Sequence, residues 1–362
     1  MPKNVCYFVG THGDWGGASR ILFNILRGLD RERFEPIVML SGRGPICEEL
    51  DQRGIEYHEW PANPNEQNPV RSLARFMRAA AFFRRKSIEI VHLNHGCLGW
   101  RPAEVLAARL LRIPVVTHCQ RIVRKASPGL RWSTLMLACS EYLADQSDTG
   151  AVPTRTVYDL VNLEKFGHGK DIRNELGLAE TDVTVSFVGR TRREKGVAMF
   201  VALATVLKQE HVRFLMTGQR VGRSTPDSYT EEEIADLVAQ DGRIRYLGYR
   251  EDIENIYASS DIIVMPSQVD EPCPAVLLEA GVCGKPVVAT DTGSNKEFLS
   301  HGETGFLVAR DDLDAMRKYV DRLISDKGLR TSMGASAKEI AERRFSREAI
   351  DDLQAVYSSL AG

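Results

Sequence analysis

The sequence has 362 residues, of which 43% are hydrophobic and 27% are charged, and its formal net charge at pH 7 is −2. A chain of this length usually exceeds a single hydrophobic core, so two domains are expected, and the ordinary composition argues against a disordered or fibrous protein. The 7 cysteines are odd in number, widely spread and without a C-x-x-C pair, which argues against a disulfide framework or a zinc ribbon.

The hydrophobic residues do not gather into a membrane-spanning segment. No apolar run approaches the roughly 18 residues that a transmembrane helix needs, and the N-terminus MPKNVCYFVGTHGDWGG has no long apolar core like that of a signal peptide. The sequence therefore predicts a cytoplasmic protein, or one that is peripheral at the inner face of the cell membrane. We expect no nucleic-acid partner.

Short apolar strands alternate with amphipathic helical segments along the first half of the chain. The strands expected there are NVCYFVG (4–10), FEPIVML (34–40), IEIVHLN (88–94) and IPVVTHC (113–119). Helical periodicity is found at residues 18–29 and 103–111. Strands separated by helix-length segments predict βαβ units and a parallel sheet.

The same alternation returns in the second half. The strands expected there are VTVSFVG (183–189), VRFLMTG (212–218), RIRYLGY (243–249), DIIVMPS (261–267) and KPVVATD (285–291). Helices are expected at residues 197–207, 253–258 and 313–324. Between the halves, residues 150–182 lose the periodicity and gather glycine, proline and charge.

The pattern predicts an α/β protein with two Rossmann-like, doubly wound parallel-sheet domains that face a cleft. The expected domains are residues 1–165 and 166–345, and residues 346–362 form a last helix that packs back on the first domain. In open parallel sheets, ligands bind beyond the carboxyl ends of the strands. The loops that follow the strands are therefore where a site is expected.

A charged loop, RTRREK, follows the strand at 183–189. Arg190 and Lys195 would lie at the C-terminal edge of the sheet. Arginine offers a planar fork for phosphate oxygens and lysine a compact charge, so the two suit a diphosphate. The alternative is a solvated basic loop, which this segment alone would favour.

The stretch DEPCPAVLLEAG (270–281) places Pro274 as the first residue of a helix. The free N–H groups at the start of that helix would attract an anion. Glu271 precedes the helix and Glu279 lies about one and a half turns inside it. Since a carboxylate accepts two hydroxyl hydrogen bonds, one could hold a sugar and the other a ribose. The alternatives are a dipole partner for Glu271 and a buried salt bridge for Glu279.

The first strand is followed by a glycine-rich turn, VGTHGDWGGASRIL. Gly10, Gly13, Gly16 and Gly17 would let the backbone approach a ligand closely at the start of a helix. The spacing departs from G-x-G-x-x-G and the acidic follow-up residue is missing, so an NAD-dependent enzyme is disfavoured. A plain tight turn is the alternative.

Taken together, these segments resemble the retaining glycosyltransferases of family 4, which have the two-domain GT-B fold. GRTRREKG is similar to that family's GR…KG segment, and EPCPAVLLEA has its E-x7-E spacing. YLGYREDIENIYASSDIIVMPS and GKPVVATDTGSNKEFLSHGETGFLV are similar to its C-terminal run, and GGASRILFNIL to its N-terminal glycine loop and helix. The resemblance covers most of the chain and is strongest in the second half.

The resemblance implies a nucleotide-diphospho-sugar donor held mainly by the second domain, and an acceptor bound by the first. Arg190 and Lys195 would neutralise the diphosphate. Glu271 would hold hydroxyls of the transferred sugar, and Glu279 the ribose. The donor-binding residues implied are Gly16, Gly17, Arg190, Lys195, Gly218, Tyr249, Cys273, Pro274, Ala275, Val276 and Glu279, and the catalytic set is Glu271, Arg190, Lys195 and His118.

The family's mechanism implies a hexosyltransferase that needs no metal and no cofactor. The leaving diphosphate takes the acceptor proton, while cations and the helix end stabilise the departing charge. The expected reaction moves a sugar from a UDP-linked donor to a glycan or lipid-linked acceptor in cell-envelope or exopolysaccharide biosynthesis. The alternatives are a sugar-nucleotide epimerase of GT-B fold and a non-catalytic nucleotide-sugar-binding subunit.

The family's histidine near the donor sugar has a displaced counterpart in PVVTHCQR (114–121). His118 stands two residues before the usual place, and Gln120 aligns with that histidine. Because strand residues alternate between faces, both would lie on one side of the strand. His118 is kept as the catalytic candidate, with Gln120 as the alternative.

Two further segments each have two interpretations. VRSLARFMRAAAFFRRKS (70–87) is either a helix packed on the first sheet with its basic residues in water, or an interfacial helix drawn to anionic lipid. DDLD (311–314) contains the D-x-D letters of metal-dependent transferases, but it precedes an amphipathic helix, which favours an N-cap. No metal site is predicted.

Overall fold

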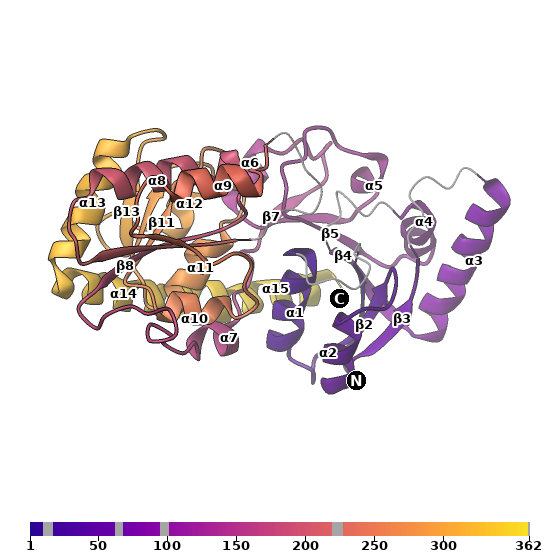
Figure 1. The fold of residues 1–362 in the computed structure, drawn as a ribbon. Coiled ribbons are helices and arrows are strands. Elements are labelled where there is room, and N and C mark those ends of the chain that lie inside the picture. Colours follow the sequence, from indigo (N-terminus) through magenta and orange to yellow (C-terminus); the bar gives the residue numbers. More distant parts are fainter. Residues whose placement is uncertain (10–16, 62–67, 95–100, 219–226, 361–362) are drawn as a thin grey trace. The chain divides into compact units, whose positions relative to one another are not determined.

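The computed structural model describes residues 1–9, 17–61, 68–94, 101–218 and 227–360. The chain divides into two compact units. The first unit is Met1–Leu160 together with Arg347–Gly362, and the second unit is Val161–Ser346. The sequence predicts the boundaries after residues 165 and 345, whereas the structure has them after residues 160 and 346. Each unit contains one parallel sheet with helices on both faces (Figure 1).

The first unit is built on a 7-stranded sheet with the order β3-β2-β1-β4-β5-β6-β7. Its strands are β1 (Lys3–Val9), β2 (Phe34–Leu40), β3 (Glu56–Glu59), β4 (Ile88–Asn94), β5 (Val115–Cys119), β6 (Leu135–Ala138) and β7 (Thr154–Thr156). All neighbouring strands are parallel. The central strands are apolar and buried along nearly their whole length, because helices cover both faces of a parallel sheet.

Two helix layers enclose this sheet. The helices are α1 (Gly17–Gly28), α2 (Ile46–Gln52), α3 (Pro69–Arg85), α4 (Pro102–Leu110), α5 (Pro128–Arg131), α6 (Glu141–Gln146) and α15 (Ala349–Leu360). One face packs against α1, α2 and α15, and the other packs against α3 and α4.

The C-terminal helix α15 is part of the first unit, although it follows the second unit in the sequence. Leu353, Val356 and Tyr357 are buried in the core that α1 shares with the sheet. The Tyr357 hydroxyl is 2.7 Å from Nδ1 of His92 on β4. Apolar burial and a buried polar contact thus tie the end of the chain to the first sheet.

The second unit repeats the design with a 6-stranded sheet in the order β10-β9-β8-β11-β12-β13. Its strands are β8 (Val183–Val188), β9 (Val212–Thr217), β10 (Ile244–Tyr246), β11 (Ile262–Met265), β12 (Val287–Thr290) and β13 (Gly305–Val308). In chain order this is the 3-2-1-4-5-6 arrangement of Rossmann-like sheets, with its reversal between β8 and β11. The predicted pair of doubly wound parallel domains is confirmed.

Helices cover both faces of the second sheet as well. They are α7 (Leu163–Gly167), α8 (Val197–Val206), α9 (Glu231–Val238), α10 (Ile253–Ala258), α11 (Ala275–Val282), α12 (Asn295–Phe298), α13 (Leu313–Ser325) and α14 (Lys327–Glu342), with a 3₁₀ turn at Arg193–Lys195 and a kinked π-type segment at Arg343–Glu348. None of the helices in the described part of the chain combines the length and apolar character that crossing a membrane requires.

The segment 150–182, over which the sequence loses its periodicity, holds two elements that were not predicted. It contains the edge strand β7 and the helix α7. The three residues of β7 are exposed or half-buried, so no apolar pattern marks them. Pairing with β6 defines this strand instead. The strands β3, β6 and β13 were missed as well, although each is as long as β11 and β12, which were predicted.

Candidate functional site

The candidate site lies at the point where the strand order of the second sheet reverses. The neighbours β8 and β11 run side by side there, and their following loops leave the sheet at the same edge. The first loop carries Arg190 and Lys195, and the second carries Ser267 and Glu271. Such a reversal is where open α/β sheets bind ligands.

Lys195 and Glu271 form an ion pair across these two loops. The Lys195 ammonium donates to Oε1 of Glu271 at 2.6 Å, and the Ser267 hydroxyl is 2.5 Å from the same oxygen. The side chains of Lys195 and Glu271 are only 19% and 11% exposed. The sequence interpretation gave them separate ligands, whereas the structure joins them into one charged group. Sequence separation hides the pair, because the two residues are 76 positions apart.

The backbone around this pair is fixed by contacts that leave no room for side chains. The Glu271 carbonyl accepts hydrogen bonds from the N–H and the hydroxyl of Ser294, at 2.8 and 2.9 Å. Gly293 has φ +57°, and a Cβ there would lie 2.4 Å from the Glu271 carbonyl oxygen. Gly196 has φ +78°, and a Cβ there would lie 1.8 Å from the carbonyl oxygen of Pro266. The two loops are therefore held close together.

The other cations of the RTRREK loop have different roles. Arg192 pairs with Asp227 and Glu194, and Arg193 pairs with Glu233 and stacks on a tyrosine ring. These two arginines are structural. Arg190, in contrast, is exposed and forms no ion pair within the described part of the chain. Its guanidinium is available to a ligand.

Helix α11 begins beside this charged group. It starts at Ala275, so the prediction that Pro274 is its first residue is wrong by one position. Pro274 has φ −85° and ψ +86°, which lies outside the helical region and makes it the N-cap. A proline cap offers no side-chain acceptor, and the first turn contains no acidic residue. The N–H groups at this end therefore suit an anion.

The residues around the start of α11 differ in exposure. Pro274 is buried, Cys273 and Val276 are half-buried, and Ala275 is exposed.

Glu279 lies on α11 and is half-buried. Its Oε2 accepts a hydrogen bond from the hydroxyl of Tyr257 at 2.7 Å. Tyr257 is fully buried in α10, and its ring meets that of Phe166 edge-on. The Tyr257 hydroxyl thereby orients the carboxylate. Sequence reasoning missed Tyr257 and Ser267 as site residues, although Ser267 is the last residue of an expected strand.

Gly218 and Tyr249 lie at the same edge of the sheet, after β9 and β10. The Gly218 N–H donates to the carbonyl of Gly248 at 3.0 Å, and a Cβ on Gly218 would lie 1.6 Å from the Gly189 carbonyl oxygen. Three strand ends are thereby packed backbone to backbone. Tyr249 is 53% exposed, which leaves its ring available for contact.

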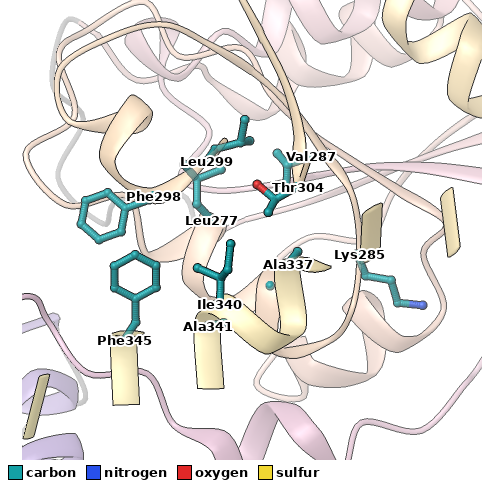
Figure 2. Close-up of a pocket in the computed structure, with 11 residues that line it drawn as sticks. Leu277, Lys285, Val287, Phe298, Leu299, Thr304, Ala337, Ile340, Ala341 and Phe345 are labelled. Atoms are coloured by element: carbon teal, nitrogen blue, oxygen red, sulfur yellow. The ribbon is translucent and has the colours of Figure 1, made fainter. Parts of the chain in front are cut away.

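A small void lies behind α11, between this helix and α14 (Figure 2). Leu277 and Ile340 line it together with the stacked rings of Phe298 and Phe345. Its volume is about 10 Å³, room for about one water molecule. Figure 2 shows the Lys285 amine pointing away from it, and this amine donates to the Ala258 carbonyl at 3.0 Å. The void is a packing gap behind the candidate site rather than a ligand pocket.

The predicted site residues of the first unit are described only in part. Gly16 lies outside the described residues, and Gly17 is the first residue of α1. His118 and Gln120 are both buried, with exposed fractions of 2% and 8%.

His118 lies in a buried polar cluster of the first unit. Its Nε2 is 3.5 Å from Oδ1 of Asp159, and its ring is 5.4 Å from that of His92. Burial lowers the pKa of His92 well below its usual value, and the neighbouring His118 lowers it further. His92 is therefore neutral at neutral pH, and the Tyr357 hydroxyl contacts its Nδ1. Asp159 was not predicted as a neighbour of His118.

Comparison with known proteins gives matches along nearly the whole chain. The sequence profile described as "Glycosyl transferase 4-like domain" matches residues 16–167, and "Glycosyl transferases group 1" matches residues 169–340. A D-inositol 3-phosphate glycosyltransferase of Corynebacterium kroppenstedtii is 31% identical over 342 residues, which cover 89% of this chain and 72% of the relative. An N-acetyl-alpha-D-glucosaminyl L-malate synthase of Bacillus anthracis is 24% identical over 317 residues, or 82% and 81% of the two chains.

Solved structures agree with the fold. A glycosyltransferase from Rickettsia africae has a TM-score of 0.82 at 21% identity and covers 99% of this chain and 98% of its own. Anabaena Alr3699/HepE in complex with UDP has a TM-score of 0.79 at 21% identity and covers 99% of both chains. The fold is GT-B, and the chain belongs to the glycosyltransferase family of group 1, with a glycosyltransferase 4-like N-terminal domain.

Proposed function

We propose that this glycosyltransferase moves a hexosyl group, with retention of configuration, from a nucleotide-diphospho-sugar to a glycan or lipid-linked acceptor. The proposed donor is UDP-linked, and the reaction needs neither metal nor cofactor. The proposed setting is cell-envelope or exopolysaccharide biosynthesis at the cytoplasmic side, with peripheral contact between residues 70–87 and an anionic membrane.

The observation that carries the donor proposal is the ion pair of Lys195 and Glu271 beside the uncapped start of α11. A cation, a helix N-terminus and a carboxylate meet at the reversal point of the sheet. The first two suit a diphosphate, and the carboxylate suits sugar hydroxyls. Because each charge already has a partner, a donor would replace the ion pair with one contact to phosphate and one to sugar.

The relatives support the same donor class. The solved structures of Anabaena Alr3699/HepE include complexes with UDP and with UDP-glucose. The latter has a TM-score of 0.77 at 22% identity. The curated relatives are named for transfer to inositol 3-phosphate and for a glucosaminyl malate product. These names describe the reactions of those proteins. The acceptor proposed for this chain does not rest on them.

In the proposed step, the bond between the anomeric carbon and the diphosphate oxygen breaks, and a bond to the acceptor oxygen forms on the same face. The acceptor proton passes to the departing diphosphate. Arg190, Lys195 and the N–H groups of α11 would stabilise the negative charge that develops on the leaving group. Glu271 would hold the transferred sugar while positive charge develops at the anomeric carbon of that sugar.

Calorimetric titration with UDP, GDP and UDP-glucose tests the donor site. Lys195→Ala removes one phosphate contact and Glu279→Ala the proposed ribose contact, so each should weaken UDP binding by about 10- to 100-fold. Arg193→Ala is the matched control, because that cation in the same loop pairs with Glu233. It should bind UDP as the wild type does. Failure of every nucleoside diphosphate to bind would refute the donor site.

Product analysis tests the chemistry. A binding subunit would hold the donor without turnover, and an epimerase would release an altered nucleotide sugar without an acceptor. Transfer with retained anomeric configuration, read by NMR and unchanged by EDTA, is the expected result. Inversion of the product would contradict the retaining mechanism, and loss of turnover in EDTA would contradict metal independence.

A further inference from the structure

Ser267 lies two residues after the end of β11 and is only 1% exposed. Its hydroxyl is 2.5 Å from Oε1 of Glu271. The carbonyl oxygens of Val269 and Glu194 are farther from it, at 3.4 and 3.5 Å. A hydroxyl has one proton to donate, and a carboxylate at this distance is typical of a charge-assisted O–H···O⁻ hydrogen bond. The Ser267 hydroxyl therefore donates to Glu271.

The backbone of Ser267 is held by residues of the neighbouring strand β12 and of helix α12. The Thr290 hydroxyl donates to the Ser267 carbonyl at 2.6 Å, and the Asn295 amide donates to the Thr290 carbonyl at 2.7 Å. All three residues are at most 1% exposed. Moving any of them would leave a buried polar group without a hydrogen bond, which costs free energy. The Ser267 hydroxyl is therefore held at a fixed place beside Glu271.

Glu271 receives its two side-chain hydrogen bonds on one oxygen. Lys195 and Ser267 both donate to Oε1, and no residue in the described part of the chain donates to Oε2. A carboxylate oxygen without a donor can accept a hydroxyl of a ligand. Oε2 is therefore the atom for the proposed contact with the transferred sugar, while the contacts at Oε1 hold the side chain in position.

The two contacts at Oε1 respond differently to a diphosphate. In the proposed function the Lys195 ammonium moves from Glu271 to the phosphate oxygens. Glu271 then loses its cation, although its side chain is only 11% exposed, and a charge in such a place needs another hydrogen-bond partner. The Ser267 hydroxyl is uncharged and buried, so a diphosphate does not draw it away. This hydrogen bond remains when the ion pair opens.

We propose that Ser267 is a positioning residue, which keeps Glu271 aligned with the transferred sugar after Lys195 has turned to the diphosphate. The serine acts through the carboxylate rather than on the donor substrate itself. The inference rests on the proposed function, because it requires Lys195 to bind phosphate and Glu271 to bind the sugar. It predicts that Ser267 matters for the sugar part of the donor and not for the nucleotide part.

Calorimetric titration of the full chain tests this prediction. The ligands are UDP and a UDP-hexose, which is the tightest-binding of UDP-glucose, UDP-galactose and UDP-N-acetylglucosamine with the wild type. The readout is the sugar selectivity, defined as the affinity for the UDP-hexose divided by the affinity for UDP. Ser267→Ala should bind UDP like the wild type and should lose about tenfold in sugar selectivity, because one hydrogen bond to a charged group is removed. Ser267→Cys should lose less, since a thiol is a weak donor of similar size.

A double-mutant cycle shows whether Ser267 acts through Glu271. Glu271→Ala removes the carboxylate and should lower the sugar selectivity by itself. Adding Ser267→Ala to this variant should lower the selectivity no further, because the serine then has no carboxylate to orient. Residues that act as one unit are non-additive in this way, whereas independent residues give losses that add.

The matched control is Ser260→Ala. Ser260 is fully buried in the same unit and precedes β11, so it lies at the opposite end of the strand from Ser267. Its hydroxyl donates to the Ile256 carbonyl at 2.6 Å and is 2.6 Å from the Ser186 hydroxyl. This variant loses a buried hydroxyl as Ser267→Ala does, but it should keep the wild-type affinities for UDP and for the UDP-hexose.

Three results would overturn the role of Ser267 while the wild type still binds UDP. They are an unchanged sugar selectivity in Ser267→Ala, an equal loss in Ser260→Ala, and a further tenfold loss when Ser267→Ala is added to Glu271→Ala. An equal fall of both affinities in Ser267→Ala leaves the selectivity unchanged and would make the serine a structural part of the loop. Failure of the wild type to bind UDP would instead refute the proposed function, and this inference with it.

Discussion

Single residues in the second unit hold the two loops of the candidate site together. Gly196 has φ +78° and approaches the carbonyl of Pro266, and it directly follows Lys195. A side chain at this position would meet backbone atoms of Pro266 rather than the flexible end of another side chain. The position of the Lys195 ammonium beside Glu271 therefore depends on a glycine as much as on the two charged residues.

We expect Gly196→Ala to lower the free energy of unfolding by about 3 kcal/mol or more, because its Cβ forces the loops apart. UDP affinity should fall at least tenfold, since Lys195 moves with the loop. Gly302→Ala is the control. Gly302 has φ +84° but open space around its Cβ, so only the backbone penalty of about 1 kcal/mol applies. Denaturant titration and calorimetry measure both effects, and equal effects of the two substitutions would contradict the close approach.

At this scale the sequence predicts which residue types gather, but not how they pair. Arg190, Lys195 and Glu271 could be chosen because each lies in a loop after an apolar strand, and Glu279 because of its E-x7-E spacing from Glu271. The contact between Lys195 and Glu271 could not be predicted, because it depends on β8 and β11 being neighbours in space. Tyr257 could not be predicted either, since a buried tyrosine in a short helix has no pattern of its own.

At the scale of elements, the contacts at the start of α13 bear on the role of its aspartates. The DDLD segment was interpreted as an N-cap rather than as metal ligands. Oδ1 of Asp312 accepts a hydrogen bond from the Ala315 N–H at 2.8 Å. This satisfies one of the N–H groups that a helix start leaves unpaired.

Two substitutions at this cap separate the two interpretations. Asp312→Ala should lower the free energy of unfolding by about 1 kcal/mol, because the cap is lost. Asp312→Asn should keep most of the stability, since asparagine caps equally well. Neither should change UDP affinity or turnover. Thermal unfolding and turnover assays measure this. A stable Asp312→Asn variant without turnover would instead indicate a metal ligand.

Most strands with apolar runs could be predicted from the sequence, and β7, which has no apolar run, could not. FEPIVML and IEIVHLN coincide with β2 and β4. The missed β7, TRT, is held by main-chain pairing with β6, which leaves no side-chain pattern. The interpretation of residues 70–87 as a packed helix is confirmed by the buried inner face of α3. Which residues of α3 are exposed on its outer face could be determined only from the structure.

At the scale of the whole molecule, the chain returns to its first unit after completing the second. Leu353 in α15 is fully buried among residues of α1 and the first sheet. The stability of the first unit therefore depends on the last residues of the chain. The proposed donor contacts lie mainly on the second unit. A substitution in α15 should therefore lower the stability of the first unit without weakening donor binding.

We expect Leu353→Ala to lower the free energy of unfolding of the first unit by about 2–5 kcal/mol, because it leaves a cavity in that core. All 4 tryptophans, at positions 15, 60, 100 and 132, belong to the first unit, so their fluorescence follows its unfolding in denaturant. UDP should still bind with wild-type affinity below that transition, because its proposed contacts lie mainly on the other unit. The exposed Asp351→Ala on the same helix is the control and should shift the transition by no more than about 0.5 kcal/mol. A tryptophan transition unchanged by Leu353→Ala would mean that α15 contributes nothing to the first core, and lost UDP binding would mean that the donor site needs an intact first unit.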